Sequence, residues 1–187
     1  YAGYIATVAG DDVAAVLREQ PARLQALLGG LDEDGAAYRY APEKWSVKEV
    51  VGHLTDAERV LAYRLLRVAR GDATPLPGFD EDAYVQAAGF DRFPLTTLLD
   101  GFAATRAATL ALVDTLTGEV WERSGVANGS PITARALAHI LAGHVRHHLL
   151  VLRERYGLAP ETRRGGHGNG PARYSPSSDR TPENEGG

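Results

Sequence analysis

Four long stretches of the chain carry hydrophobic residues at every third or fourth position, which is the spacing of an amphipathic helix. The first stretch is expected to begin at an N-cap aspartate, Asp11 or Asp12, and to end at Gly29–Gly30. Pro21 interrupts this stretch, so we expect either a kinked helix or two short helices there. Residues 1–9 show no clear period.

The second stretch has the clearest helix start in the chain. Ser46 and Glu49 stand three residues apart, as in a capping box, where each side chain accepts a hydrogen bond from the other residue's backbone N–H. Trp45 and Val50 occupy the positions of a hydrophobic staple across that start. We expect the helix to end near Arg70–Gly71.

Two further helices complete the pattern. The third is expected to run from Pro94, at the first helical position, to Gly118, after a shorter helical segment over residues 80–88. The fourth is expected to begin at Ser130–Pro131, as N-cap and first helical residue, and to end near Tyr156–Gly157. Four such helices predict an all-α fold, an antiparallel four-helix bundle.

The bundle is expected to occupy residues 1–160. Residues 161–187 are rich in Gly, Pro, Ser, Arg and Glu and contain almost no aliphatic side chains, so they cannot bury a core of their own. We therefore expect this segment to be a flexible C-terminal tail.

Composition narrows the possible function classes. The formal net charge is -4, and basic residues alternate with acidic ones, so no basic surface for nucleic acid is expected. No apolar run is long enough to span a bilayer, and a soluble cytoplasmic protein is expected. The absence of cysteine leaves His, Asp and Glu as metal ligands. Because the chain has no methionine, its native start is expected to lie upstream of Tyr1.

Two histidines interrupt the apolar seam of the fourth helix. His144 and His148 are four residues apart, which places them about 40° apart on a helix. Both stand where the repeat of Leu137 and Leu141 calls for a hydrophobic residue. His147 is expected at the flank of this seam, and His139 lies farther round the helix.

Two interpretations of these histidines remain open from the pattern alone. Each could be a structural core histidine with its own hydrogen-bond partner. Alternatively, His144 and His148 could share a metal ion, which satisfies both buried imidazoles at once. His53, in the second helix beside its apolar stripe, would supply a third ligand if the two helices pack together.

The remaining charged residues have weaker claims on such a site. Asp56 lies one turn after His53 and could face the site, either as a hydrogen-bond acceptor for a ligand or as a base; a solvated surface acid is the alternative. Glu49 is already explained by the capping box. Glu58 is expected on the outer face of its helix, and Arg64 is interpreted as a helix-face charge.

Two segments together resemble the DinB-like superfamily of small helical metal proteins, which includes YfiT-like proteins assigned as hydrolases and thiol-dependent S-transferases. They are residues 45–56, WSVKEVVGHLTD, and residues 143–148, GHVRHH. The resemblance covers roughly residues 10–157. It implies a four-helix bundle with an up-down-down-up arrangement and a homodimer. It also implies a zinc or nickel ion held by His53, His144 and His148.

The resemblance implies no single reaction. A metal-dependent enzyme is the first hypothesis, with an open metal position that takes a thiol or water. Transfer of a low-molecular-weight thiol, such as mycothiol or bacillithiol, is slightly favoured over hydrolysis of a small-molecule substrate. The alternative is a stress-related metal-binding protein without catalytic activity.

Overall fold

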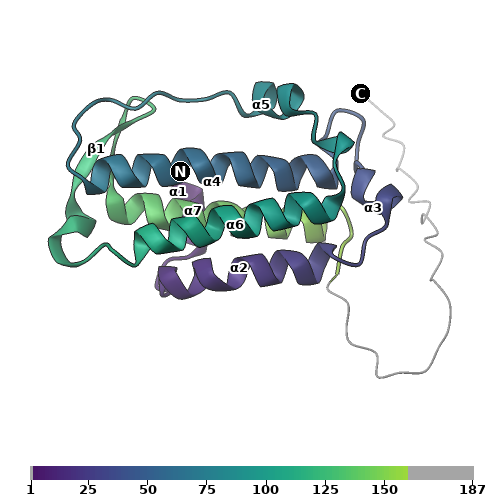
Figure 1. The fold of residues 1–187 in the computed structure, drawn as a ribbon, viewed down its shortest axis with the longest axis horizontal. Helices are drawn as coiled ribbons and strands as arrows, with labels where there is room; N and C mark the ends of the chain where they lie inside the picture. Colours follow the sequence, from purple (N-terminus) through teal and green to yellow (C-terminus); the bar gives the residue numbers. More distant parts are fainter. Residues whose placement is uncertain (1, 160–187) are drawn as a thin grey trace, which may run out of the picture.

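The computed structural model describes residues 2–159, so the predicted tail over residues 161–187 lies outside the described residues. Its main elements are four long helices, namely α2 (Val13–Leu28), α4 (Val47–Ala69), α6 (Leu95–Val113) and α7 (Ala134–Glu154). The shorter elements are α1 (Ala2–Thr7), α3 (Glu33–Ala37), α5 (Glu81–Ala88), the 3-10 helices η1 (Phe90–Arg92) and η2 (Gly118–Glu122), and strands β1 (Ser124–Ala127) and β2 (Ser130–Thr133). The predicted helical bundle is confirmed (Figure 1).

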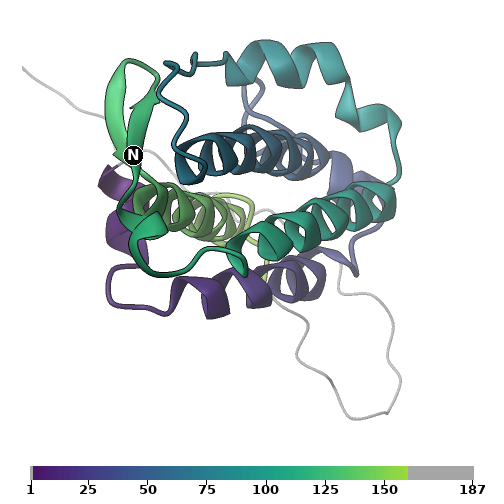
Figure 2. The ribbon, with the colours of Figure 1, turned by 60° about the vertical axis from the view of Figure 1, so that its left-hand side comes forward.

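The four long helices follow an up-down-down-up course (Figures 1 and 2). Each of α2 and α4 packs against both α6 and α7. The start of α2 lies beside the end of α6, where Arg18 pairs with Asp114, so these two helices are antiparallel. Tyr156, just after the end of α7, donates a hydrogen bond to the backbone oxygen of Trp45, just before the start of α4, so α7 and α4 are also antiparallel. Helices α4 and α6 run the same way, so the long connection over residues 70–94 must return along the bundle, and it carries α5 over α4.

The core consists of two apolar clusters with a polar layer between them. One cluster surrounds Leu65 and Leu137, and the other surrounds Leu54 and Leu152. Every long helix contributes buried polar side chains to this layer: Gln20 from α2, His53 and Glu58 from α4, Arg106 from α6 and His144 from α7. The histidine seam predicted for the last helix therefore lies at mid-height in the bundle.

Two charged residues of α4 are buried, contrary to the sequence prediction. Glu58 and Arg64 each expose only 2% of their surface. The prediction of an outer position was wrong because α4 packs against α6, α7 and α5, so its buried arc is wider than its hydrophobic stripe. Among the described residues, no helix is both long and apolar enough to cross a membrane.

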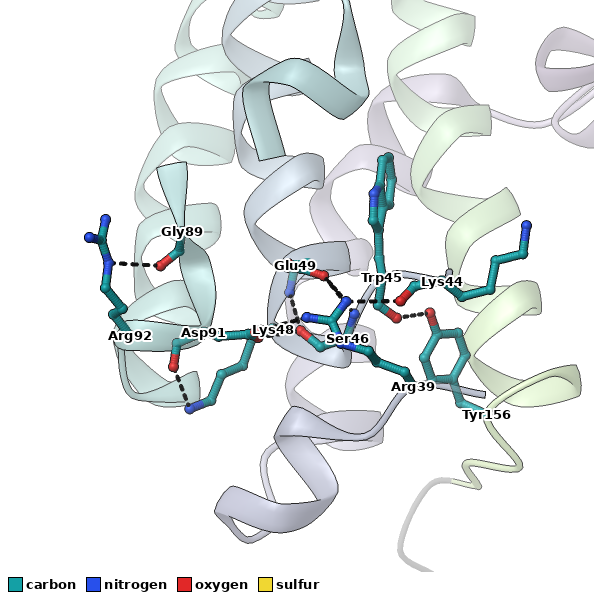
Figure 3. Close-up of polar contacts among 10 residues, drawn as sticks. All are labelled: Arg39, Lys44, Trp45, Ser46, Lys48, Glu49, Gly89, Asp91, Arg92 and Tyr156. Carbon is teal, nitrogen blue, oxygen red and sulfur yellow. Dashed lines mark hydrogen bonds and ion pairs between the residues drawn. The ribbon is translucent and has the colours of Figure 1, made fainter. Parts of the chain in front are cut away.

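The predicted start of α4 is confirmed. The Ser46 hydroxyl accepts a hydrogen bond from the Glu49 backbone N–H at 3.0 Å, and the Glu49 carboxylate accepts one from the Ser46 backbone N–H at 2.9 Å. Arg39 binds both Glu49 and Asp91 and so ties this turn to the segment before α6 (Figure 3). These contacts fix the first turn of the helix that carries His53.

The predicted start of the last helix was wrong. Residues 130–133 form β2, which pairs with β1 in an antiparallel hairpin, and α7 begins at Ala134 with Thr133 as its N-cap. The turn residues Asn128 and Gly129 both have positive φ angles, 51° and 73°, as a two-residue hairpin turn requires. In the folded protein Asn128 and Gly129 form the turn of a hairpin, so Ser130 and Pro131 begin a strand and not a helix.

Other elements refine the sequence predictions. Helix α2 continues through Pro21 as one 16-residue helix, so the alternative of two short helices was wrong. Helix α6 ends at Val113, before the predicted Gly118, because residues 118–122 form η2. Residues 2–7, which show no clear hydrophobic period, form α1.

Helix α1 is held against α7 at Gly143. A Cβ atom at this position would lie 2.0 Å from the backbone oxygen of Tyr4, closer than any real contact. Arg146, one turn farther along, binds the backbone oxygen of Thr7 and pairs with Asp11 at 2.8 Å. The glycine therefore allows the close approach of the two helices beside His144.

We expect Gly143→Ala to destabilise the protein by about 1–3 kcal/mol, because the Tyr4 backbone must move away from α7. Urea unfolding would measure this loss, and limited proteolysis should show faster cleavage within α1. The matched control is Gly101→Ala in α6, where an added Cβ meets nothing within 4 Å and should raise stability by up to about 1 kcal/mol. Equal stabilities for the two variants would contradict the close approach.

Candidate metal centre

Three histidine side chains converge in the polar layer. His53 comes from α4, and His144 and His148 come from successive turns of α7. The Nε2 atom of His144 lies 3.0 Å from Nε2 of His53 and 3.2 Å from Nε2 of His148. One donor atom from each of the three residues lies within 4.8 Å of the other two. The structure thus brings together the three residues that the sequence singled out.

All three imidazoles are uncharged at neutral pH; His53 and His144 are buried, and His148 is partly buried. Burial lowers the pKa of His53 to about 4 and that of His144 to about 3, and it lowers the pKa of His148 well below its ordinary value. In the latter two, the neighbouring histidines lower the pKa further. Neutral imidazole is the form that binds a metal, so protons do not compete for these nitrogens near pH 7.

The spacing of the nitrogens fits a shared divalent cation. Imidazole nitrogens bound to a tetrahedral zinc ion at about 2.0–2.1 Å lie about 3.3 Å from one another, close to the separations found here. Hydrogen bonding explains the cluster less well, because Nε2 of a neutral imidazole carries either one proton or one lone pair. Nε2 of His144 can therefore satisfy only one of its two neighbours, whereas a cation accepts all three lone pairs.

Aromatic rings hold two of the histidines in place. The Trp45 ring packs on His53 with a centroid distance of 4.6 Å, and the Tyr156 hydroxyl donates a 2.6 Å hydrogen bond to the backbone oxygen of Trp45 (Figure 3). The Tyr4 ring meets His144 edge-on at 5.3 Å. Side chains from α1, from the segment before α4 and from the segment after α7 therefore hold the histidine rings in place.

The other predicted histidines have different surroundings. The His147 ring lies between the rings of Tyr4 and His148, at centroid distances of 5.5 and 5.1 Å, beside the three-histidine cluster rather than in it. His139 is partly exposed, and its Nδ1 lies 2.9 Å from the backbone oxygen of Arg135. Both placements agree with the expectation that neither is a ligand.

Asp56 is paired with a neighbour on its own helix. Its carboxylate accepts a 2.9 Å hydrogen bond from Arg59, one turn along α4. The pair lies at the protein surface, with the Arg59 side chain 60% exposed and that of Asp56 23% exposed. The role of Asp56 at the metal site stays a prediction.

A carboxylate that was not among the predicted site residues lies closer to the cluster. Oε2 of Glu81, in the first turn of α5, is 3.9 Å from Nε2 of His53. Burial raises the pKa of Glu81, and the nearby Asp82 and Asp80 raise it further. The acidic start of the predicted segment over residues 80–88 was the available signal, but only the fold shows that the segment lies over α4.

Two hollows adjoin the cluster on opposite sides along the bundle axis. The first, which we call the side pocket, has a volume of about 350 Å³ and is bordered by three aromatic rings and by Asp82, His147 and His148. The rings belong to Tyr40, Trp45 and Tyr156. The second, the water cavity, has a volume of about 20 Å³ and lies toward Ile140 and Leu61. Its polar border consists of Tyr4, Glu81 and His144, and its apolar border of Ala57, Leu61, Phe79 and Ile140.

A buried ion pair lies beside the cluster in the same polar layer. Nε and Nη2 of Arg106 each donate a 2.8 Å hydrogen bond to the Glu58 carboxylate. Nη1 donates to the Leu17 backbone oxygen and to the side-chain oxygen of Gln20. The Gln20 amide in turn donates to the backbone oxygen of Ala142, two residues before His144. This network joins all four long helices at the height of the histidine cluster.

Comparisons with known proteins place the chain among helical bundles. The family model described as the DinB superfamily matches residues 17–152. The solved structure of YfiT from Bacillus subtilis, described as a probable metal-dependent hydrolase with an unusual four-helix bundle topology, is 22% identical with a TM-score of 0.67. The match covers 78% of this chain and 86% of that one.

A second solved structure, of a mycothiol-dependent maleylpyruvate isomerase, is 13% identical with a TM-score of 0.62. That match covers 74% of this chain and 58% of the other. No protein in the curated set gives a significant match. At these identities the two structures show a shared fold, and the family match rests on the sequence of residues 17–152.

Proposed function

The chain belongs to the DinB superfamily, and from that premise we propose that it is a metal-dependent enzyme whose ion is held by His53, His144 and His148. The observation that carries the proposal is the convergence of three neutral imidazoles, two of them buried and one partly buried, on one point. Three nitrogen donors and no thiolate suit zinc or nickel, which are the ions we propose. A divalent ion held by these three histidines would supply Lewis acidity, and a four-coordinate ion would have one position left for a further ligand.

Hydrolysis of a small molecule is the reaction that this geometry supports best. The side pocket, at about 350 Å³, is near the lower end of the range for ligand pockets, so it holds one small organic molecule. The water cavity on the other side of the cluster has room for about one water molecule. A substrate and a water nucleophile can thus approach the same three histidines from two directions. YfiT, with the same fold, is described as a probable metal-dependent hydrolase.

Transfer of a low-molecular-weight thiol is the second candidate. The side pocket is open to solvent and has aromatic walls, so an organic thiol could enter beside His148. The mycothiol-dependent maleylpyruvate isomerase shares the fold. Transfer, however, requires the thiol and its electrophilic partner to occupy the site together. A pocket of this size favours hydrolysis for that reason.

A two-stage experiment tests the proposal. Chelator-stripped protein would be titrated with zinc and with nickel, and we expect about one ion per chain for the preferred metal. The loaded protein would then be assayed for hydrolysis of nitrophenyl esters and anilides, and for conjugation of several thiols to chlorodinitrobenzene. Hydrolysis without conjugation supports the first candidate, and the reverse supports the second. Metal binding with neither activity would favour the non-catalytic metal-binding protein, and no metal binding would refute the proposal.

A further inference from the structure

Glu81 lies at the junction between the histidine cluster and the water cavity. Its Oε2 is 3.9 Å from Nε2 of His53, and its side chain borders the cavity together with His144 and Tyr4. At that distance from Nε2, the carboxylate makes no direct hydrogen bond to His53. One molecule between the carboxylate and the cluster would instead connect them.

The cavity has the size and chemistry for a single water molecule. A volume of about 20 Å³ exceeds the roughly 10–15 Å³ that one water requires. Four of its bordering side chains are apolar, so the polar groups at Glu81, Tyr4 and His144 determine how a water molecule would be held. The cavity is too small for an organic substrate, which would have to bind in the side pocket.

The fold determines the position of Glu81. Asp80 caps α5 by accepting a 3.0 Å hydrogen bond from the Ala83 backbone N–H. The segment leading to it is held by Arg64, which is buried in α4, donates to the Pro77 backbone oxygen at 2.5 Å and lies 6.0 Å from the ring centre of Phe79. Arg64 is therefore a positioning residue for the segment that carries Glu81.

The neighbouring residue on α5 faces the other hollow. Asp82 borders the side pocket, whereas Glu81 borders the water cavity. The start of this helix thus contributes one carboxylate to each side of the cluster. Because the two hollows lie on opposite sides of the histidines, a water molecule next to Glu81 and a substrate next to His148 would not compete for space.

We propose that Glu81 is the general base of the site and takes a proton from a water molecule held in the water cavity. This inference rests on the proposed hydrolytic function. The carbonyl group of an ester or amide bound in the side pocket would have to reach the histidine cluster, next to the water cavity. One O–H bond of the water then breaks and its proton moves to Oε2 of Glu81, while the water oxygen bonds to that carbonyl carbon. Glu81 then returns the proton to the departing alcohol or amine as the C–O or C–N bond breaks, so both products are neutralised and the carboxylate is restored.

The zinc-loaded wild-type protein and Glu81→Gln test this role. In a crystal structure of the zinc-loaded wild type, we expect an ordered water within about 2.6–3.2 Å of the Glu81 carboxylate and bordered by His144. Glu81→Gln should keep about one zinc per chain and the wild-type melting temperature, while nitrophenyl ester hydrolysis falls by about 10²–10⁴-fold. Glu154→Gln is the control, because it removes the same charge at the exposed end of α7.

The outcomes separate this inference from the proposed function. A Glu81 carboxylate that binds zinc directly, or turns to solvent with no water beside it, overturns the proton-acceptor role while leaving the metal site intact. Hydrolysis that is the same in Glu81→Gln and Glu154→Gln also overturns it. If the wild type hydrolyses none of the test esters, the position of the water in the crystal structure decides. Failure of the wild type to bind zinc refutes the proposed function itself, and the role of Glu81 with it.

Discussion

His144→Ala is expected to weaken zinc binding by more than about 100-fold, because His144 supplies the nitrogen that lies nearest to both other ligands. Even residues that only support metal ligands change affinity by about 10–100-fold when mutated, so loss of a ligand should exceed that range. Competition with a chromogenic chelator would measure the affinity, and elemental analysis of chelator-free protein would measure the zinc content.

The matched control for this variant is His139→Ala. His139 lies on the same helix, five residues earlier; it is partly exposed, and its ring is hydrogen-bonded to the backbone of Arg135. It should keep the wild-type affinity and about one zinc per chain. Because His144 is buried, His144→Gln should be prepared as well, since it keeps most of the side-chain volume. Wild-type zinc affinity in both His144 variants would show that the cluster is not the metal site.

The histidines of α7 could be identified from the sequence because they break a pattern. A helix seam with leucines at 137 and 141 requires hydrophobic residues at 144 and 148, and two imidazoles there need a common explanation. His53 has no such signal in its own helix: the residues allowed it as a third ligand only if the two helices pack together, and the resemblance of residues 45–56 then implied that role. The structure brings it to 3.0 Å from His144.

Glu81 could not be predicted because its position depends on the course of the chain. Since α4 and α6 run the same way, the connection between them must return along the bundle, and α5 is laid over α4 on the way, with Glu81 3.9 Å from His53. The sequence of residues 80–88 indicates a short capped helix but not where that helix lies. Whether two neighbouring helices run parallel or antiparallel depends on how their apolar faces pack in the bundle, and no local sequence pattern determines this.

The hairpin and the buried charges were missed for two different reasons. The two strands are only four residues long, too short for an alternating pattern to stand out, and the sequence prediction used the cap pattern of Ser130–Pro131 without considering the Asn128–Gly129 turn before it. Glu58 was placed outside because a carboxylate is rarely buried without a partner. Its partner, Arg106, lies 48 residues farther along on another helix. Only the packed bundle brings the two together.

Arg106→Leu is expected to destabilise the protein by about 3–5 kcal/mol, because it leaves the Glu58 carboxylate buried without its cation. Gln20 and the Leu17 backbone oxygen also lose their donor. For a chain of this length, such a loss corresponds to a fall of about 10 °C or more in melting temperature. Urea unfolding of the metal-free protein would measure the free energy without any contribution from bound metal.

Two further variants show whether the loss comes from the unpaired charge. Arg18→Leu removes a pair of the same type at the surface, with Asp114, and should cost less than about 1 kcal/mol. The double variant Glu58→Leu with Arg106→Leu removes both buried charges and should recover most of the loss, since apolar replacements of buried ion pairs are often neutral or stabilising. A double variant that is as unstable as Arg106→Leu would instead mean that the pair is needed to join the four helices in the layer that holds His144.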